Sequence, residues 1–215
     1  MKSYVITILQ NKRSVKVANR CIKSGAKCGI TVEQWRATTP KDNPNQLLLS
    51  ENIVTSGLNE KYSRSNNCAA AFHSHFSLWK HCININETIL IMEHDAVIVG
   101  NIPNITFNKV ITLAKPSYGN YNTPNFLGVG LMVQAPYTKG AHGYMINPSG
   151  AKKLIDKAKT DAGPTDVFLN KTNFPFIQEY YPWLIEAHDS FTTIQNIDGC
   201  KAKHNYGETY DIEAV

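Results

Sequence analysis

The chain has 215 residues, 42% of them hydrophobic, which suits one globular domain that buries roughly 70% of its unfolded surface. Its 22 Lys and Arg residues against 17 Asp and Glu give a formal net charge of +5, but they are scattered and argue against a nucleic-acid partner. No apolar run reaches the ~18 residues of a transmembrane segment, the opening residues lack a signal-peptide pattern, and the five cysteines are unclustered, so we expect a cytoplasmic protein with reduced thiols.

The first 35 residues predict a strand, a helix and a second strand. Tyr4 to Leu9 is an apolar, β-branched run, and Gly29 to Trp35 is another. Between them, apolar side chains recur at helical spacing from Val15 to Ile22, and Gly25 is expected to end that helix. The loops that follow the strands of such a βαβ unit are where open α/β sheets bind ligands.

The middle of the chain predicts a long loop, a helix and a buried strand. Thr38 to Asn67 is rich in Asn, Pro and Ser, and we expect an irregular loop there. Cys68 to Cys82 has the apolar spacing of a helix that packs on a sheet. Thr88 to Met92 is almost continuously apolar, as in a strand buried on both faces. This strand runs into Glu93-His94-Asp95 and is expected to resume over Ala96 to Val99.

The remaining elements complete one α/β domain, which we expect over residues 1–199, followed by a poorly ordered tail over residues 200–215. The predicted strands are Val110 to Leu113, Gly143 to Ile146 and Trp183 to Ala187, and the predicted helices are Gly150 to Lys159 and Pro164 to Leu169. The first of these helices follows Asn147-Pro148-Ser149, which is typical of a helix start.

The Glu93-His94-Asp95 motif gives the main chemical prediction. Two carboxylates at the mouth of an apolar strand are costly to bury unless a cation or strong hydrogen-bond donors compensate them. Since alternate residues of a strand point the same way, Glu93 and Asp95 would face one ligand while His94 turns the other way. Such oxygen ligands suit Mn²⁺ or Mg²⁺ bridging a pyrophosphate, although an acidic pair at a strand end can also be a solvated turn.

Five sequence blocks occur in the order found in a known enzyme family. They are Tyr4 to Asn11 with Arg13, Ser74-His75-Phe-Ser-Leu-Trp79, Thr88 to Val97, Gly143 to Leu154, and Pro164 to Leu169. These blocks resemble glycosyltransferase family 25, which includes lipopolysaccharide and collagen galactosyltransferases, and they span residues 3–190. The chain departs from the family at His94, where the family has the middle acid of Glu-Asp-Asp, and at residues 118–138, which match no block.

The resemblance implies an α/β fold of the GT-A type, a Rossmann-like nucleotide-sugar-binding fold whose central, mostly parallel sheet is flanked by helices. It also implies a metal-dependent enzyme that moves a hexose or deoxyhexose from a UDP-sugar donor to a glycan or glycoprotein acceptor. Small domains of this general kind occur in large DNA viruses that glycosylate their own capsids. A viral protein that acts in the host cytoplasm is therefore a further expectation.

The resemblance and the strand geometry together suggest which residues form the donor site. Asp95 is expected to bind Mn²⁺ or Mg²⁺, and Glu93 either to share this ion or to fix the donor ribose. His188 is expected to be a third ligand, with His204 as the alternative. The candidate donor-binding residues follow the first two strands or lie in the family motifs: Leu9, Asn11, Arg13, Ala37, Thr38, Ser74, His75, Glu93 and His94. Of these, Arg13 fits a surface helix residue equally well.

Transfer with inversion needs a carboxylate that takes the proton of the acceptor hydroxyl. We expect Asp166 to be this base, with Asp189 as a second candidate. As the third residue of a helix that starts with Pro164, Asp166 also stands where an acid stabilises the helix dipole. A retaining mechanism would need neither residue as a base.

Two functions of other classes fit parts of the same pattern. A metal-dependent nucleotidyl or phosphoryl transferase would also use acids at a strand end, but the chain has no glycine-rich phosphate-binding loop. A sugar-nucleotide or glycan-binding module without turnover stays an alternative because His94 departs from the family motif.

Overall fold

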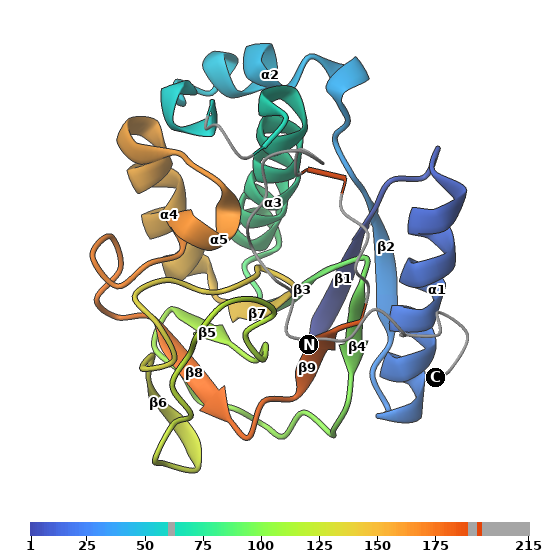
Figure 1. Ribbon diagram of the computed structural model, residues 1–215, viewed down its shortest axis with the longest axis vertical. Coiled ribbons are helices and arrows are strands. Elements are labelled where there is room, and N and C mark those ends of the chain that lie inside the picture. The colour runs from blue at the N-terminus through green and yellow to red at the C-terminus, as the bar shows by residue number, and fades with distance from the viewer. Residues whose placement is uncertain (60–62, 189–192, 195–215) are drawn as a thin grey trace.

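The computed structural model (Figure 1) describes residues 1–59, 63–188 and 193–194, and within them seven strands form one sheet in the order β2-β1-β3-β7-β5-β8-β6. These strands are β1 (Lys2–Thr7), β2 (Val32–Arg36), β3 (Ile89–Glu93), β5 (Val110–Thr112), β6 (Gly128–Leu131), β7 (Gly143–Ile146) and β8 (Gln178–Tyr181). Strands β2, β1, β3, β5 and β8 point one way, whereas β7 and β6 run against them. The predicted α/β architecture with a central, mostly parallel sheet is confirmed.

Helices cover both faces of this sheet. They are α1 (Lys12–Lys27), α2 (Pro44–Ser50), α3 (Ser65–Ile85), α4 (Pro148–Asp161) and α5 (Thr165–Phe168). Figure 1 shows α1 on one side of the sheet and α3 with α4 on the other. A two-stranded ribbon of β4 (Ala96–Ile98) and β9 (Ile185–Ala187) packs beside α1. Within the part of the chain that the structure describes, no helix is both long and apolar enough to span a membrane.

The first four residues of β3 are apolar because they are buried on both faces of the sheet. Leu90 and Met92 pack in the cluster on the α1 side, whereas Ile89 and Ile91 pack in the cluster on the α3 side. All four side chains are fully buried, and burying each contributes about 1.5–3 kcal/mol relative to leaving it in water. This double burial holds the end of β3, and with it Glu93, in a fixed place.

Helix α1 does not end at Gly25, as the sequence suggested, but continues to Lys27. A Cβ atom at Gly25 would lie 2.7 Å from Cγ2 of Val32, so a glycine stands there because the helix approaches β2 closely. The turn is made four residues later by Gly29, whose φ of +70° favours glycine. The glycine of the turn and the glycine of the close contact cannot be told apart in the sequence.

The segment 38–67 is not the irregular loop that its composition predicted. It contains the 3₁₀ helices η1 (Pro40–Asp42) and η2 (Ser56–Leu58) on either side of α2, and α3 already begins at Ser65. The two prolines that suggested broken structure stand at the first positions of η1 and α2, where their fixed φ favours a helix start. Its described residues therefore place regular short helices after the end of β2.

Two strands were not predicted, and one predicted strand is placed differently. No pattern in the sequence indicates β6 or β8, since β6 is the glycine-containing edge strand Gly-Val-Gly-Leu and β8 is four mostly polar residues. Residues 96–98 do not continue β3, because the chain turns at His94 and Asp95 and β4 then pairs with β9 in a separate sheet. The predicted tail over residues 200–215 lies outside the described residues.

Candidate functional site

A cavity of about 570 Å³ lies at the carboxyl ends of β1, β2 and β3. These three strands are parallel, so the loops that follow them meet at one edge of the sheet. Nine predicted site residues from four separate segments line the cavity: Asn11, Arg13, Ala37, Thr38, Ser74, His75, Glu93, His94 and Asp95. Leu9 does not line it and is 46% exposed, because β1 ends at Thr7.

The loop after β1 is held in place by the start of α1. Asn11 is the N-cap, and its Oδ1 accepts hydrogen bonds from the backbone N–H groups of Arg13 at 2.9 Å and Ser14 at 3.2 Å. The backbone N–H of Ile8 donates to Oγ of Ser14 at 2.9 Å. The Asn11 side chain is therefore engaged with the helix, and Arg13 is the charged residue that this loop brings to the cavity.

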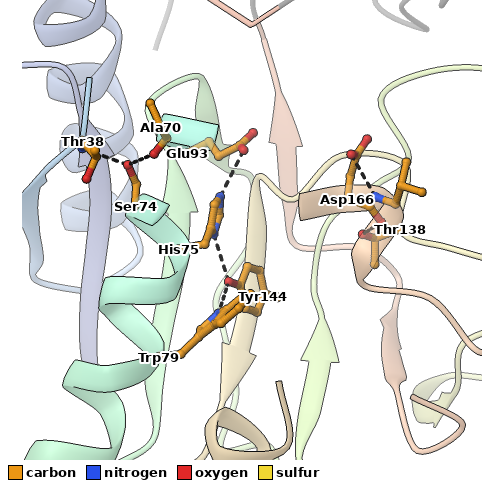
Figure 2. Close-up of polar contacts among 10 residues, drawn as sticks. Thr38, Ala70, Ser74, His75, Trp79, Glu93, Thr138, Tyr144 and Asp166 are labelled. Atoms are coloured by element: carbon orange, nitrogen blue, oxygen red, sulfur yellow. Dashed lines mark hydrogen bonds and ion pairs between the residues drawn. The ribbon is translucent and has the colours of Figure 1, made fainter. Parts of the chain in front are cut away.

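The loop after β2 is tied to α3 by Ser74. The N–H of Thr38 donates to Oγ of Ser74 at 2.9 Å, and this hydroxyl donates to the carbonyl of Ala70 at 2.8 Å (Figure 2). Ser74 is 1% exposed, so both of its hydrogen-bonding partners are protein groups. The structure thus places Ser74 as a brace between the loop and the helix rather than at the open surface of the cavity.

His75 joins the acidic motif to the core. Its Nε2 lies 3.3 Å from Oε1 of Glu93, and its Nδ1 lies 2.9 Å from the hydroxyl oxygen of Tyr144 (Figure 2). The same hydroxyl oxygen accepts a hydrogen bond from Nε1 of Trp79 at 2.8 Å. Burial disfavours ionisation of Glu93, but the hydrogen bond from His75 and the nearby histidines His75, His142 and His94 outweigh it and hold the Glu93 pKa below its usual value. Glu93 therefore enters the cavity as a carboxylate.

His94 lines the cavity together with Glu93 and Asp95, contrary to the expectation that it turns away. Strand alternation does not apply here because β3 ends at Glu93 and the chain turns over the next two residues. Nδ1 of His94 lies 2.8 Å from Oγ of Ser14. The same oxygen also accepts from the N–H of Ile8 at 2.9 Å, so Ser14 ties His94 to the loop after β1.

The two carboxylates fit a divalent cation only with help from a ligand. Among the described residues, no group of three or more His, Cys, Asp or Glu side chains is arranged to hold a metal ion. Mg²⁺ and similar ions in nucleotide-binding sites commonly use one or two carboxylates and complete their shell with phosphate oxygens and water. Glu93 and Asp95, both in the cavity wall, match that donor set.

His188, the expected third ligand, is placed differently. Its Nε2 lies 3.2 Å from Oε2 of Glu186, while its backbone N–H donates to the carbonyl of Asp95 at 3.1 Å. The residue is thus next to the acidic motif along the backbone, but its side chain faces β9 and does not line the cavity. The alternative ligand His204 and the second base candidate Asp189 lie outside the described residues.

Asp166 lies outside the cavity wall. Its Oδ2 accepts a hydrogen bond from the Tyr118 hydroxyl, and its Oδ1 accepts one from the N–H of Val167 at 2.9 Å. Burial raises the pKa of Asp166, and the charge of Glu93 raises it further, whereas the Tyr118 hydrogen bond acts the other way. Helix α5 starts at Thr165, with Pro164 as its N-cap, so Asp166 is its second residue rather than its third.

The start of α3 and the segment 193–194, which were not predicted as parts of the site, complete the cavity. Asn67 donates to the carbonyl of Thr193 at 2.6 Å, and the carbonyl of Ile194 accepts from the N–H of Arg64 at 2.9 Å. The additional lining residues on α3 and just before it are Arg64, Asn67, Ala70 and Ala71. The spacing of Asn67, Ala70 and Ala71 puts them on the same helix face as Ser74, and the predicted start at Cys68 left Asn67 out of this face.

Comparison with known proteins adds a family match. The model described as Glycosyltransferase family 25 (LPS biosynthesis protein) matches residues 1–118. No curated protein sequence matches the chain. CTP:phosphocholine cytidylyltransferase (LicC) from Streptococcus pneumoniae has a similar structure, with a TM-score of 0.39 and 10% identity over 86% of this chain and 91% of that chain. The apo form of mouse xyloside xylosyltransferase 1 has a TM-score of 0.38 and 12% identity over 82% and 83%.

Proposed function

The chain belongs to glycosyltransferase family 25, and from this premise we propose that it transfers a hexose or deoxyhexose from a UDP-sugar to a hydroxyl group of a glycan or glycoprotein. One observation carries the proposal: the ends of three parallel strands, an acidic motif and two arginines line a single cavity. Its volume of about 570 Å³ is within the range of small-molecule sites, roughly 300–1,000 Å³. The residues matched by the family model, 1–118, include every residue that lines the cavity except Thr193 and Ile194.

We assign the parts of the donor by the chemistry of the walls. The uracil and ribose would lie against the loops after β1 and β2, at Asn11, Ala37 and Thr38, and the diphosphate would lie toward Glu93 and Asp95. Arg13 and Arg64 bring positive charge to the α1 and α3 walls, which suits an anionic ligand. The imidazole of His94 stands where the family has an acid, and it also lines the cavity.

Glu93 and Asp95 would hold Mn²⁺ or Mg²⁺ together with the donor phosphates. When bound, the ion would neutralise the diphosphate and stabilise the charge that develops on the leaving nucleotide. Without a cation, two carboxylates and a diphosphate would repel each other in a partly desolvated cavity. The lowered pKa of Glu93, due to its hydrogen bond with His75 overcoming burial, keeps that carboxylate ionised for this role.

Asp166 is proposed as the base that takes the acceptor proton in an inverting transfer. Its raised pKa, caused first by burial and then by the charge of Glu93, brings it closer to neutrality, where a general base works best. Figure 2 shows the carboxylates of Glu93 and Asp166 directed toward the same side of the sheet. Asp166 would then act on the acceptor side, apart from the donor cavity.

The first test is the metal dependence of nucleotide binding. We expect UDP affinity, measured by titration calorimetry with Mn²⁺, to fall at least about tenfold when a chelator removes the ion, because the diphosphate loses its counter-charge. UMP, which lacks the second phosphate, serves as the matched ligand and should depend less on Mn²⁺. Equal UDP affinity with and without chelator would rule out the metal bridge.

The second test separates sugar transfer from the alternative functions. Incubation with a panel of UDP-sugars and Mn²⁺ should release UDP slowly, and faster once a suitable acceptor glycoside is present. Release of a nucleoside monophosphate would instead indicate a nucleotidyl or phosphoryl transferase. Binding of UDP-sugars without any product, across the acceptors tried, would indicate a module without turnover.

A further inference from the structure

We propose that the buried hydrogen-bonded chain Trp79–Tyr144–His75 positions the Glu93 carboxylate, holding one oxygen and presenting the other to the cavity. His75 would then be a positioning residue that acts through Glu93 and not a group that binds the sugar. The inference rests on the proposed function only in taking Glu93 to bind the donor or its cation.

The polarity of this chain follows from its two ends, because the indole of Trp79 can only donate and the ionised carboxylate of Glu93 can only accept. The indole of Trp79 can only donate, so the Tyr144 oxygen accepts at that contact, 2.8 Å away. The proton of the Tyr144 hydroxyl is then available for Nδ1 of His75, at 2.9 Å. With Nδ1 accepting, a neutral His75 ring carries its proton on Nε2, which faces Oε1 of Glu93 at 3.3 Å. Every polar atom along the chain is thus paired in one consistent direction.

The chain runs from the core to the cavity. Trp79, Tyr144 and His75 are 0%, 1% and 1% exposed, whereas the Glu93 side chain is 31% exposed. Figure 2 shows one Glu93 oxygen toward His75 and the other directed away from it. Because the first three residues are fixed by packing, the last hydrogen bond fixes the direction of the carboxylate.

The supporting residues come from rigid elements. His75 and Trp79 are four residues apart and lie on one face of α3. Tyr144 stands on β7 opposite Ile91 of the neighbouring β3, two residues before Glu93. The rings of His75 and Tyr144 are stacked, with their centroids 5.8 Å apart and their planes inclined by 23°. The opposite tautomer of His75 would turn an acceptor nitrogen toward the carboxylate and repel it.

Removing only the Tyr144 hydroxyl tests the chain. We expect Tyr144→Phe to weaken UDP binding in the presence of Mn²⁺ by about 10–100-fold, the usual effect of losing a group that orients a ligating side chain. Tyr4→Phe is the matched control, since the Tyr4 hydroxyl lies 2.9 Å from Nε2 of His81, also on α3, and neither residue lines the cavity. Equal losses in both variants would overturn the proposal, because they would reflect only a lost buried hydroxyl.

The histidine itself gives a second test that does not depend on turnover. Long-range ¹H–¹⁵N spectra of the metal-free protein, recorded over a pH series, should show the proton of the uncharged ring form of His75 on Nε2, and Tyr144→Phe should shift that form toward a mixture of tautomers. A proton on Nδ1 in the parent protein would overturn the proposed polarity. Since the spectra need no nucleotide, they remain decisive even if UDP does not bind and the proposed donor site fails.

A pair of substitutions at position 75 separates positioning from packing. His75→Gln places an amide oxygen and an amide N–H where the ring nitrogens stand, so it can accept from Tyr144 and donate to Glu93. We expect it to keep most of the Mn²⁺-dependent UDP affinity, whereas His75→Phe should lose about 10–100-fold. Equal affinities in the two variants, with melting temperatures matched to the parent, would contradict a positioning role.

Discussion

Replacing Asp95 by Asn is expected to weaken Mn²⁺-dependent UDP binding and to lower sugar transfer together, each by roughly 10²–10³-fold. The estimate follows from removing one partner of a partly buried charge pair, which costs about 3–5 kcal/mol, while Asn keeps the size of the side chain. Glu93→Gln should act in the same direction, since both residues line the cavity. Calorimetry with UDP and Mn²⁺ gives the affinities, and UDP release with an acceptor glycoside gives the rates.

Asp156→Asn is a suitable control for the change in net charge. Asp156 is on α4, lies 3.4 Å from the exposed Lys159 and does not line the cavity. Its substitution should leave both UDP affinity and transfer within about twofold, because exposed ion pairs contribute little. If Asp95→Asn behaves like this control, Asp95 does not hold the cation, and the donor must be bound through Glu93 and the arginines alone.

The grouping of the donor-site residues could be predicted because it follows from strand direction. Asn11 and Ala37 follow the two strands of the opening βαβ unit and Glu93 ends the next strand, and parallel strands deliver such residues to one edge. The apolar run before Glu93 correctly predicted a strand that is buried on both faces of the sheet. These parts of the fold depend on patterns within about ten residues, which a sequence shows directly.

The parts that were missed depend on contacts between distant segments. The orientation of Glu93 is set by Tyr144, 69 residues from its partner His75, and no local pattern reveals that hydrogen bond. Gly25 looked like a helix end, but its role is a close approach to Val32. The inward position of His94 follows from a turn that neither propensity nor alternation predicts in an acidic motif.

The residues of α3 at the cavity show how a small error in a boundary hides part of a site. The predicted helix began at Cys68, whereas α3 begins at Ser65. The three omitted residues include Asn67, which lines the cavity and donates to the carbonyl of Thr193. Extending the apolar spacing of the helix backward by one turn would have put Asn67 on the face of Ser74.

Asp166→Asn is expected to divide binding from chemistry. If Asp166 is the base, the substitution should lower the transfer rate by about 10²–10⁴-fold and leave UDP affinity within about twofold, because Asp166 does not line the donor cavity. Asp161→Asn, an exposed α4 position paired with Lys157, is the control for charge and should change neither quantity appreciably. Parent-like transfer by Asp166→Asn would leave Asp166 as a helix-terminus residue and move the search to Asp189 or to a retaining mechanism.

The raised pKa of Asp166 predicts how sugar transfer depends on pH in the parent protein and in the Tyr118→Phe variant. The base works only when ionised, so kcat/KM should fall as pH drops through that pKa, which burial and the charge of Glu93 place above the usual value. The Tyr118 hydrogen bond lowers the same pKa, and Tyr118→Phe should therefore move the acid limb to higher pH. The pKa of Asp166 is higher in the folded than in the unfolded protein, so its ionised form destabilises the fold. The stability that protonated Asp166 contributes at low pH is therefore lost as pH rises from the unfolded-state pKa through the folded-state pKa. Asp166→Asn should then melt at or above the parent temperature at neutral pH while losing activity, and a lower melting temperature with parent-like pH dependence would identify Asp166 as purely structural.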